Sequence, residues 1–122
     1  MTKLALEDHG NVAIVRLANG VTNAVSPELV AELALALREV QGRFRGMVLA
    51  GGNKFFSIGL DLPALLKLSR KDMAAFWVGF EDAVLALYTL PIPTAAAIAG
   101  HAPAAGTILA LACDFRMIAS GK

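Results

Sequence analysis

The feature that most constrains this chain is a long uncharged stretch, residues 94–113. It covers 20 residues without an Asp, Glu, Lys or Arg, which is about the length of a membrane-spanning helix. Its middle, however, contains Gly100, Pro103 and Gly106, and these residues interrupt a continuous helix. We therefore expect a buried strand, a tight turn of small residues and a buried helix, rather than a membrane span.

Strands and helices alternate along the rest of the chain as well. Runs rich in β-branched residues predict strands, and apolar residues at helical spacing after a Ser N-cap predict helices. The expected strands are residues 4–7, 12–17, 46–50, 94–99 and 115–119, and the expected helices are 27–41, 62–68, 70–90 and 104–113. This alternation predicts an α/β fold with buried strands.

The composition limits the possible partners. The chain has 11 basic and 10 acidic residues and a formal net charge of +1, so charge gives no reason to expect a nucleic acid or an anionic membrane as partner. Hydrophobic residues make up 57% of the chain, against roughly 45–50% in a typical soluble domain. We expect this excess to reflect a piece of a larger protein.

Cysteine usage and the N-terminal residues narrow the cellular setting. Cys113 is the only cysteine, which excludes a disulfide scaffold and argues against a Cys-based metal site. We expect it to be buried as a small apolar residue. Residues 1–8 include acids and no long apolar run, so we expect a cytoplasmic protein without a signal or transit peptide.

Two segments combine a buried strand, a glycine-containing turn and the start of a helix. The first is Asn-Lys-Phe-Phe-Ser-Ile-Gly-Leu-Asp-Leu at residues 53–62, and the second is Ile-Ala-Gly-His-Ala-Pro-Ala-Ala-Gly-Thr at residues 98–107. Such turns can direct backbone N–H groups outward, and the small residues at 104–106 would let a ligand approach the backbone. Taken alone, each segment is equally typical of ordinary helix packing.

Together, Phe-Ser-x-Gly-x-Asp-Leu at residues 56–62 and Gly-x-x-Pro-Ala-x-Gly at residues 100–106 resemble the crotonase (enoyl-CoA hydratase/isomerase) superfamily. The details of residues 56–62, 76–88 and 103–116, with Asn-Ala at residues 23–24, resemble its mitochondrial-type Δ3,Δ2-enoyl-CoA isomerases. The resemblance implies a crotonase-like (ClpP/crotonase) α/β spiral of ββα units. It makes residues 1–122 the N-terminal part of one such domain, incomplete at the C-terminus and without the trimerisation helices.

The resemblance also implies a mechanism. The backbone N–H groups of Leu60 and Ala105 would form an oxyanion hole for the thioester oxygen of an acyl-CoA and would stabilise the enolate formed by proton abstraction. Residues that would contact the substrate or its coenzyme A part are Ala24, Ile58, Gly59, Leu60, Asp61, Leu62 and Ala105. Asp61 has an alternative role as the N-cap of the helix that follows it.

One position distinguishes between the reactions of the family. Hydratases of the family carry a Glu two residues after the last glycine of the second motif, where this chain has Ile108. Hydration is therefore disfavoured, whereas isomerisation needs a single carboxylate, which the resemblance places beyond Lys122. A non-catalytic acyl-CoA-binding protein, an assembly subunit, and a dehalogenase or hydrolase of the family are the alternatives.

The same resemblance implies the remaining partners. Acyl-CoA would be the substrate, no cofactor or metal would be permanently bound, and the full-length protein would form a homotrimer or hexamer. Other polar residues have structural interpretations. We expect His9, Glu81 and Asp82 to be exposed to solvent, His101 to be structural, and Asp114 and Arg116 to form a turn with an ion pair.

Overall fold

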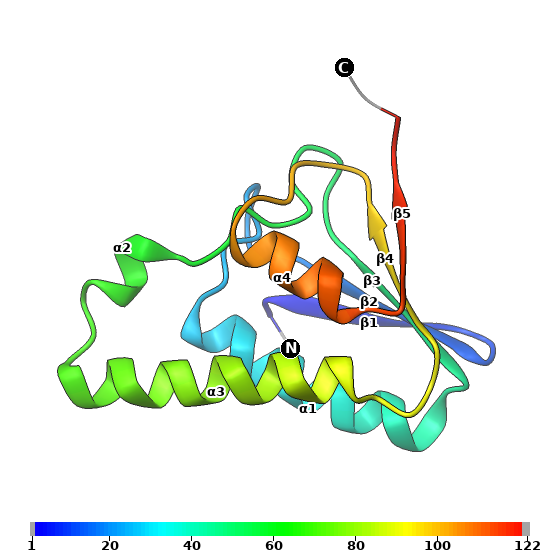
Figure 1. Ribbon diagram of the computed structural model, residues 1–122, viewed down its shortest axis with the longest axis horizontal. Helices are drawn as coiled ribbons and strands as arrows, with labels where there is room; N and C mark the ends of the chain where they lie inside the picture. Colours follow the sequence, from blue (N-terminus) through cyan, green and yellow to red (C-terminus); the bar gives the residue numbers. More distant parts are fainter. Residues whose placement is uncertain (1, 121–122) are drawn as a thin grey trace.

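A computed structural model describes residues 2–120 and contains one five-stranded sheet (Figure 1). The strands are β1 (Leu4–His9), β2 (Val12–Leu17), β3 (Gly46–Ala50), β4 (Thr94–Ile98) and β5 (Phe115–Ile118). They lie in the sheet in chain order, with β1 antiparallel to β2 and every later neighbour parallel. The predicted α/β fold is confirmed, and each predicted strand is present to within about two residues.

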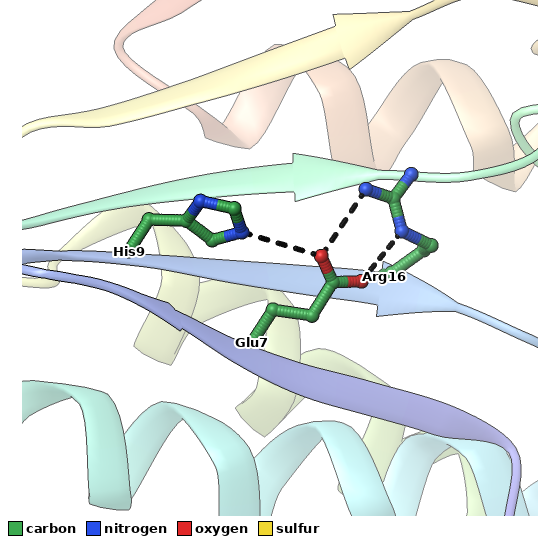
Figure 2. A network of polar contacts seen from close by, with 3 residues as sticks. All are labelled: Glu7, His9 and Arg16. Atoms are coloured by element: carbon green, nitrogen blue, oxygen red, sulfur yellow. Dashed lines mark hydrogen bonds and ion pairs between the residues drawn. The ribbon is translucent and has the colours of Figure 1, made fainter.

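A hairpin joins the first two strands. Its turn contains Gly10, which has a φ of 75°, a conformation that glycine adopts without steric cost. Glu7 on β1 lies beside Arg16 on β2, with 2.7 Å between Oε2 of Glu7 and Nε of Arg16, and the exposed His9 lies next to them (Figure 2). The hydrogen bond from Arg16 is the main cause that lowers the pKa of Glu7.

Helix boundaries follow the capping residues. The helices are α1 (Pro27–Arg43), α2 (Leu62–Leu65), α3 (Arg70–Tyr88) and α4 (Ala105–Ala112). The side chains of Ser26 and Ser69 accept hydrogen bonds from backbone N–H groups of α1 and α3, as predicted. Helix α2 is shorter than the expected 62–68, because the chain turns after Leu65 to reach the cap of α3.

The helices lie on one side of the sheet (Figure 1). Each connection from β2 onward advances by one strand in the same direction, and crossovers of one handedness then place their helices on a common face. Helix α3 packs against both α1 and α4. The core lies between these helices and the inward side chains of the sheet, such as Val15, Leu49 and Ala96. None of the helices in residues 2–120 is long and apolar enough to cross a membrane.

The opposite face of the sheet is not covered by the described helices, and it is apolar over β3, β4 and β5, whereas its β1–β2 part carries Glu7 and Arg16. Residues paired in register point to the same side of a sheet, which places Val48, Ala95 and Phe115 together on this face. Phe115 and Met117 are 64% and 70% exposed. Because parallel strands usually have both faces covered, this face is one location of the apolar excess in the composition.

The expected ion pair between Asp114 and Arg116 is wrong. Asp114 accepts a hydrogen bond from the backbone N–H of Thr94 at 2.9 Å and donates its own N–H to Oγ1 of Thr94 at 2.9 Å. Arg116 donates to the backbone carbonyl of Cys113 at 2.9 Å. Each side chain therefore satisfies backbone groups at the end of α4 or the start of β4, where polar groups lack a partner in the regular structure.

Cys113 is buried, as predicted, and this makes its reactivity testable. Burial raises the pKa of its thiol from 9.0 to about 11, which lowers the thiolate population at neutral pH by about 100-fold. We expect a thiol-specific reagent at mildly alkaline pH to react with the folded protein about 100-fold more slowly than with the urea-unfolded chain. Equal rates in the two states would show that the thiol is accessible.

Candidate functional site

The loop between β3 and α2, residues 51–61, runs beside the turn between β4 and α4. The N–H of His101 donates to the carbonyl of Lys54 at 3.0 Å, and the carbonyl of His101 accepts from the N–H of Phe56 at 2.8 Å. Phe55 and His101 thus form a short parallel bridge. The two segments that the sequence singled out are therefore side by side. His101 contributes to this pairing through its backbone, while its side chain is exposed and its ring centre lies 5.6 Å from that of Phe55.

Glycines allow this close approach. A Cβ added to Gly106 would lie 2.3 Å from the carbonyl oxygen of Ser57, and one added to Gly100 would lie 2.5 Å from the carbonyl carbon of Lys54. Both distances are far below normal contact. Side chains at these positions would push the two segments apart, so the motif glycines are required for packing between backbones.

Backbone pairing sets the direction of the Leu60 N–H. Leu60 forms a parallel bridge with Val25, in which Val25 donates to the carbonyl of Gly59 at 2.7 Å and Asp61 donates to the carbonyl of Val25 at 2.9 Å. The N–H of Leu60 and the carbonyl of Gly59 belong to one trans peptide group, in which N–H and C=O point in opposite directions. Because that carbonyl faces Val25, the N–H of Leu60 points away from Val25. Within residues 2–120 it donates to no acceptor.

A tight turn leaves a second N–H group unpaired at the start of α4, in a residue that is only 4% exposed. Pro103 accepts a hydrogen bond from the N–H of Gly106 at 2.9 Å, and Ala104 has φ 50° and ψ −123°, the first central position of a type II′ turn. No side chain caps this helix. The N–H of Ala105, the first residue of α4, likewise finds no acceptor in the described part of the chain.

The two N–H groups belong to segments in contact. A Cβ added to Gly59, which has a φ of 104°, would lie 3.1 Å from the nitrogen of Ala105. Leu60 directly follows Gly59, so both donors lie where the loop meets the N-terminus of α4. Two unpaired backbone donors next to the positive end of a helix suit an oxygen that carries or develops negative charge.

The other residues predicted to contact coenzyme A differ in how exposed they are. Ala24 is half-buried and precedes Val25, the bridge partner of Leu60. Ile58 and Leu62 are 39% and 61% exposed. The carboxylate of Asp61 accepts a hydrogen bond from the N–H of Ala64 at 3.2 Å, which confirms the alternative role of Asp61 as the cap of α2. Contacts of these residues with coenzyme A stay a prediction.

Ile108 lies on α4 almost one turn after Ala105 and is 44% exposed. It borders an open cavity of about 350 Å³ between α3 and α4, whose other lining residues are Phe80, Glu81, Val84, Leu85 and Tyr88. Glu81 and Asp82 are exposed, as expected. No cluster of three or more His, Cys, Asp or Glu side chains that could hold a metal ion is present in residues 2–120.

Two buried polar residues near this loop had no role assigned from the sequence. Asn23 and Ser57 are 2% and 0% exposed, and both form hydrogen bonds that hold the loop at residues 55–59. Both belong to the segments on which the family resemblance depends. Their burial was not visible in the sequence, because polar residues in a loop are ordinarily exposed.

The role of Gly106 can be tested by adding one methyl group. We expect Gly106→Ala to lower the free energy of unfolding by about 1–3 kcal/mol, because its Cβ would overlap the backbone of Ser57. Gly42 on α1 offers a matched control, since a Cβ there meets nothing within 4 Å. Gly42→Ala should leave stability unchanged or raise it by up to about 1 kcal/mol. Chemical denaturation measures both, and an unchanged midpoint for Gly106→Ala would contradict the close approach.

The turn at Ala104 gives the opposite expectation. Its positive φ strains a non-glycine residue by about 1–3 kcal/mol, whereas the extra unfolded-state freedom of glycine costs roughly 0.5–1 kcal/mol. Ala104→Gly should therefore raise the free energy of unfolding by about 1 kcal/mol. Ala102→Gly, just before this turn, should lower it, since Ala102 is not among the residues with positive φ. Thermal unfolding of the two variants measures the sign of each change in stability. If the turn at Ala104 were unstrained, both variants would lose stability.

Comparison with known proteins identifies the family of the chain. The family model for enoyl-CoA hydratase/isomerase matches residues 7–121. Human mitochondrial enoyl-CoA delta isomerase 1 is 33% identical over 111 residues, which cover 88% of this chain and 37% of that protein. The probable enoyl-CoA hydratase EchA17 of Mycobacterium tuberculosis is 36% identical over 108 residues, which cover 87% of this chain and 41% of that protein.

Solved structures give the same result. The crystal structure of human mitochondrial delta3-delta2-enoyl-CoA isomerase superposes with a TM-score of 0.88 at 31% identity, covering 93% of this chain and 46% of that one. Enoyl-CoA hydratase from Bacillus anthracis gives a TM-score of 0.85 at 28% identity, with 93% and 46% covered. The chain thus spans less than half the length of these relatives. It belongs to the enoyl-CoA hydratase/isomerase family, and it has the fold of the crotonase enzymes.

Proposed function

We propose that this chain binds the thioester group of an acyl-CoA, whose carbonyl oxygen accepts hydrogen bonds from the backbone N–H groups of Leu60 and Ala105. The observation that carries the proposal is the pair of unpaired donors on two segments held in contact. Because these donors belong to the backbone, the side chains of Leu60 and Ala105 can differ between relatives without loss of the site.

The chemistry would follow from the charge on the thioester oxygen. Removal of a proton from the carbon next to the carbonyl produces an enolate, and its negative charge accumulates on that oxygen. A preorganised donor directed at such an oxygen lowers the barrier by roughly 3–4 kcal/mol. The two donors would therefore favour reactions that pass through a thioester enolate.

Among such reactions we propose the conversion of 3-enoyl-CoA to 2-enoyl-CoA, in fatty-acid metabolism. This isomerisation moves one proton from C2 to C4 and needs one carboxylate, whereas hydration also needs a group that activates water. Ile108 supplies an apolar side chain where hydratases of the family have Glu, and its surroundings between α3 and α4 are largely apolar. An apolar surface there suits an acyl chain better than an activated water.

The wider arrangement is proposed from the family to which the chain belongs. Residues 58–62 and Ala24 would lie along the pantetheine and adenine parts of coenzyme A. This chain would form the N-terminal part of a single crotonase-like domain. The whole protein would assemble as a homotrimer or hexamer.

Thioester binding can be measured without turnover. Hexanoyl-CoA labelled isotopically at the thioester carbonyl should show a lower carbonyl stretching frequency when bound, because two hydrogen bonds polarise the C=O group. Leu60→Ala should retain the shift, since it keeps the backbone N–H. Infrared difference spectroscopy distinguishes the outcomes. Binding without a shift would rule out the two-donor site.

Turnover separates the reactions. With 3-hexenoyl-CoA, an isomerase produces the conjugated thioester, so ultraviolet absorption increases. With 2-hexenoyl-CoA, a hydratase consumes it, and absorption decreases. An increase with the first substrate alone supports the proposal. These assays use the whole protein, because the carboxylate for isomerisation is expected beyond Lys122. There, a carbonyl shift without either change would instead identify a non-catalytic acyl-CoA-binding protein.

A further inference from the structure

The segment that carries Leu60 is held from one side by a loop at residues 19–25. The N–H of Ile58 donates to the carbonyl of Thr22 at 2.9 Å, and the hydroxyl of Ser57 donates to the carbonyl of Asn23 at 2.7 Å. Two consecutive residues shortly before Leu60 are therefore fixed by this loop, in addition to the bridge between Leu60 and Val25.

Asn23 lies at the centre of this contact and uses both ends of its side-chain amide. Its Nδ2 donates to the carbonyl oxygens of Phe55 and Phe56, each at 3.3 Å, and its Oδ1 accepts from the N–H of Asn19 at 2.8 Å. Its φ of 50° lies in the left-handed region, which Asn enters more readily than most residues. One side chain thus connects the start of the 19–25 loop to the segment before Leu60.

Ser57 completes the network. Its hydroxyl donates to Asn23, as described, and accepts from the N–H of Gly59 at 3.2 Å, the residue directly before Leu60. No buried side-chain nitrogen or oxygen within residues 2–120 lacks a hydrogen-bond partner. A buried polar network in which every member is satisfied is rigid, so the backbone from Phe55 to Gly59 has little freedom to rotate.

We infer that Asn23 is a positioning residue, whose buried amide fixes the loop before Leu60 and thereby the direction of the Leu60 N–H. Asn23 is only 2% exposed, so it acts through the loop. The inference rests on the proposed function, because it concerns the same donor. A donor stabilises developing charge best when it need not reorient during the reaction. Loss of the tether therefore weakens carbonyl polarisation more than it weakens binding of the rest of the acyl-CoA.

Two variants and one control test the inference. Asn23→Gly removes the amide and accommodates the positive φ. Ser57→Ala removes one hydroxyl from the other side of the contact, and it keeps the test open if Asn23→Gly does not fold. Thr94→Val is the control, because Thr94 is also 2% exposed and its hydroxyl bonds Asp114 at the opposite end of β4. It should reduce stability without changing the loop.

The readouts are the carbonyl frequency of bound, isotope-labelled hexanoyl-CoA, its dissociation constant and the unfolding temperature of each variant. We expect both loop variants to lose about half of the frequency shift or more, with dissociation constants within about threefold of the unchanged protein. Thr94→Val should keep the full shift at a comparable loss of stability.

The outcomes separate the inference from the proposed function. If the unchanged protein shows the shift and both folded loop variants keep it, Asn23 does not position the donor, while the two-donor site stands. A shift that decreases in all three variants in proportion to stability would mean that Asn23 is structural only. If the unchanged protein binds hexanoyl-CoA without a shift, the proposed function fails and the inference fails with it.

Discussion

Contact between backbones is the constraint on which the rest of this structure depends. The backbone of the loop at residues 51–61 lies directly against the backbone of the β4–α4 turn. It is joined to the 19–25 loop by backbone hydrogen bonds and by the side chains of Asn23 and Ser57. Gly51, Gly100 and Gly106 each lie where a Cβ would come within 2.5 Å of another backbone atom. Hydrogen bonds between the backbones then fix the register of the three segments. This close contact brings the segments that carry the N–H groups of Leu60 and Ala105 together.

A site made of backbone donors needs rigid support, because the chain has few side chains there to hold a ligand. The support comes from groups whose burial or backbone conformation each costs folding free energy. Asn23 and Ser57 are polar and buried, and Ala104 has a strained φ. Buried polar groups are tolerated when every donor and acceptor is paired, and strain persists when surrounding contacts determine the conformation. Both conditions are met around the loop.

The apolar excess of the composition has a location in the fold. One face of the sheet packs against the helices, and the other presents Val48, Ala95 and Phe115 without cover from the described residues. The α3–α4 surface adds exposed residues such as Leu85, Tyr88 and Ile108. Hydropathy alone could not show whether the uncharged stretch at residues 94–113 is a membrane-spanning helix. Gly100 and Pro103 within the stretch argued against one, because they interrupt a helix.

Local signals in the sequence determined the order of elements, the capping residues Ser26, Asp61 and Ser69, and the family, since each depends on neighbouring residues. The tertiary structure decided which polar groups pair across the fold. Asp114 bonds Thr94 rather than Arg116, and Asn23 bonds Phe55 and Phe56 rather than water. The partners in each of these hydrogen bonds are at least 20 residues apart in the sequence. Other groups of the same hydrogen-bonding chemistry were available to each side chain. Their choice therefore depends on packing, which brings distant backbones together and excludes water.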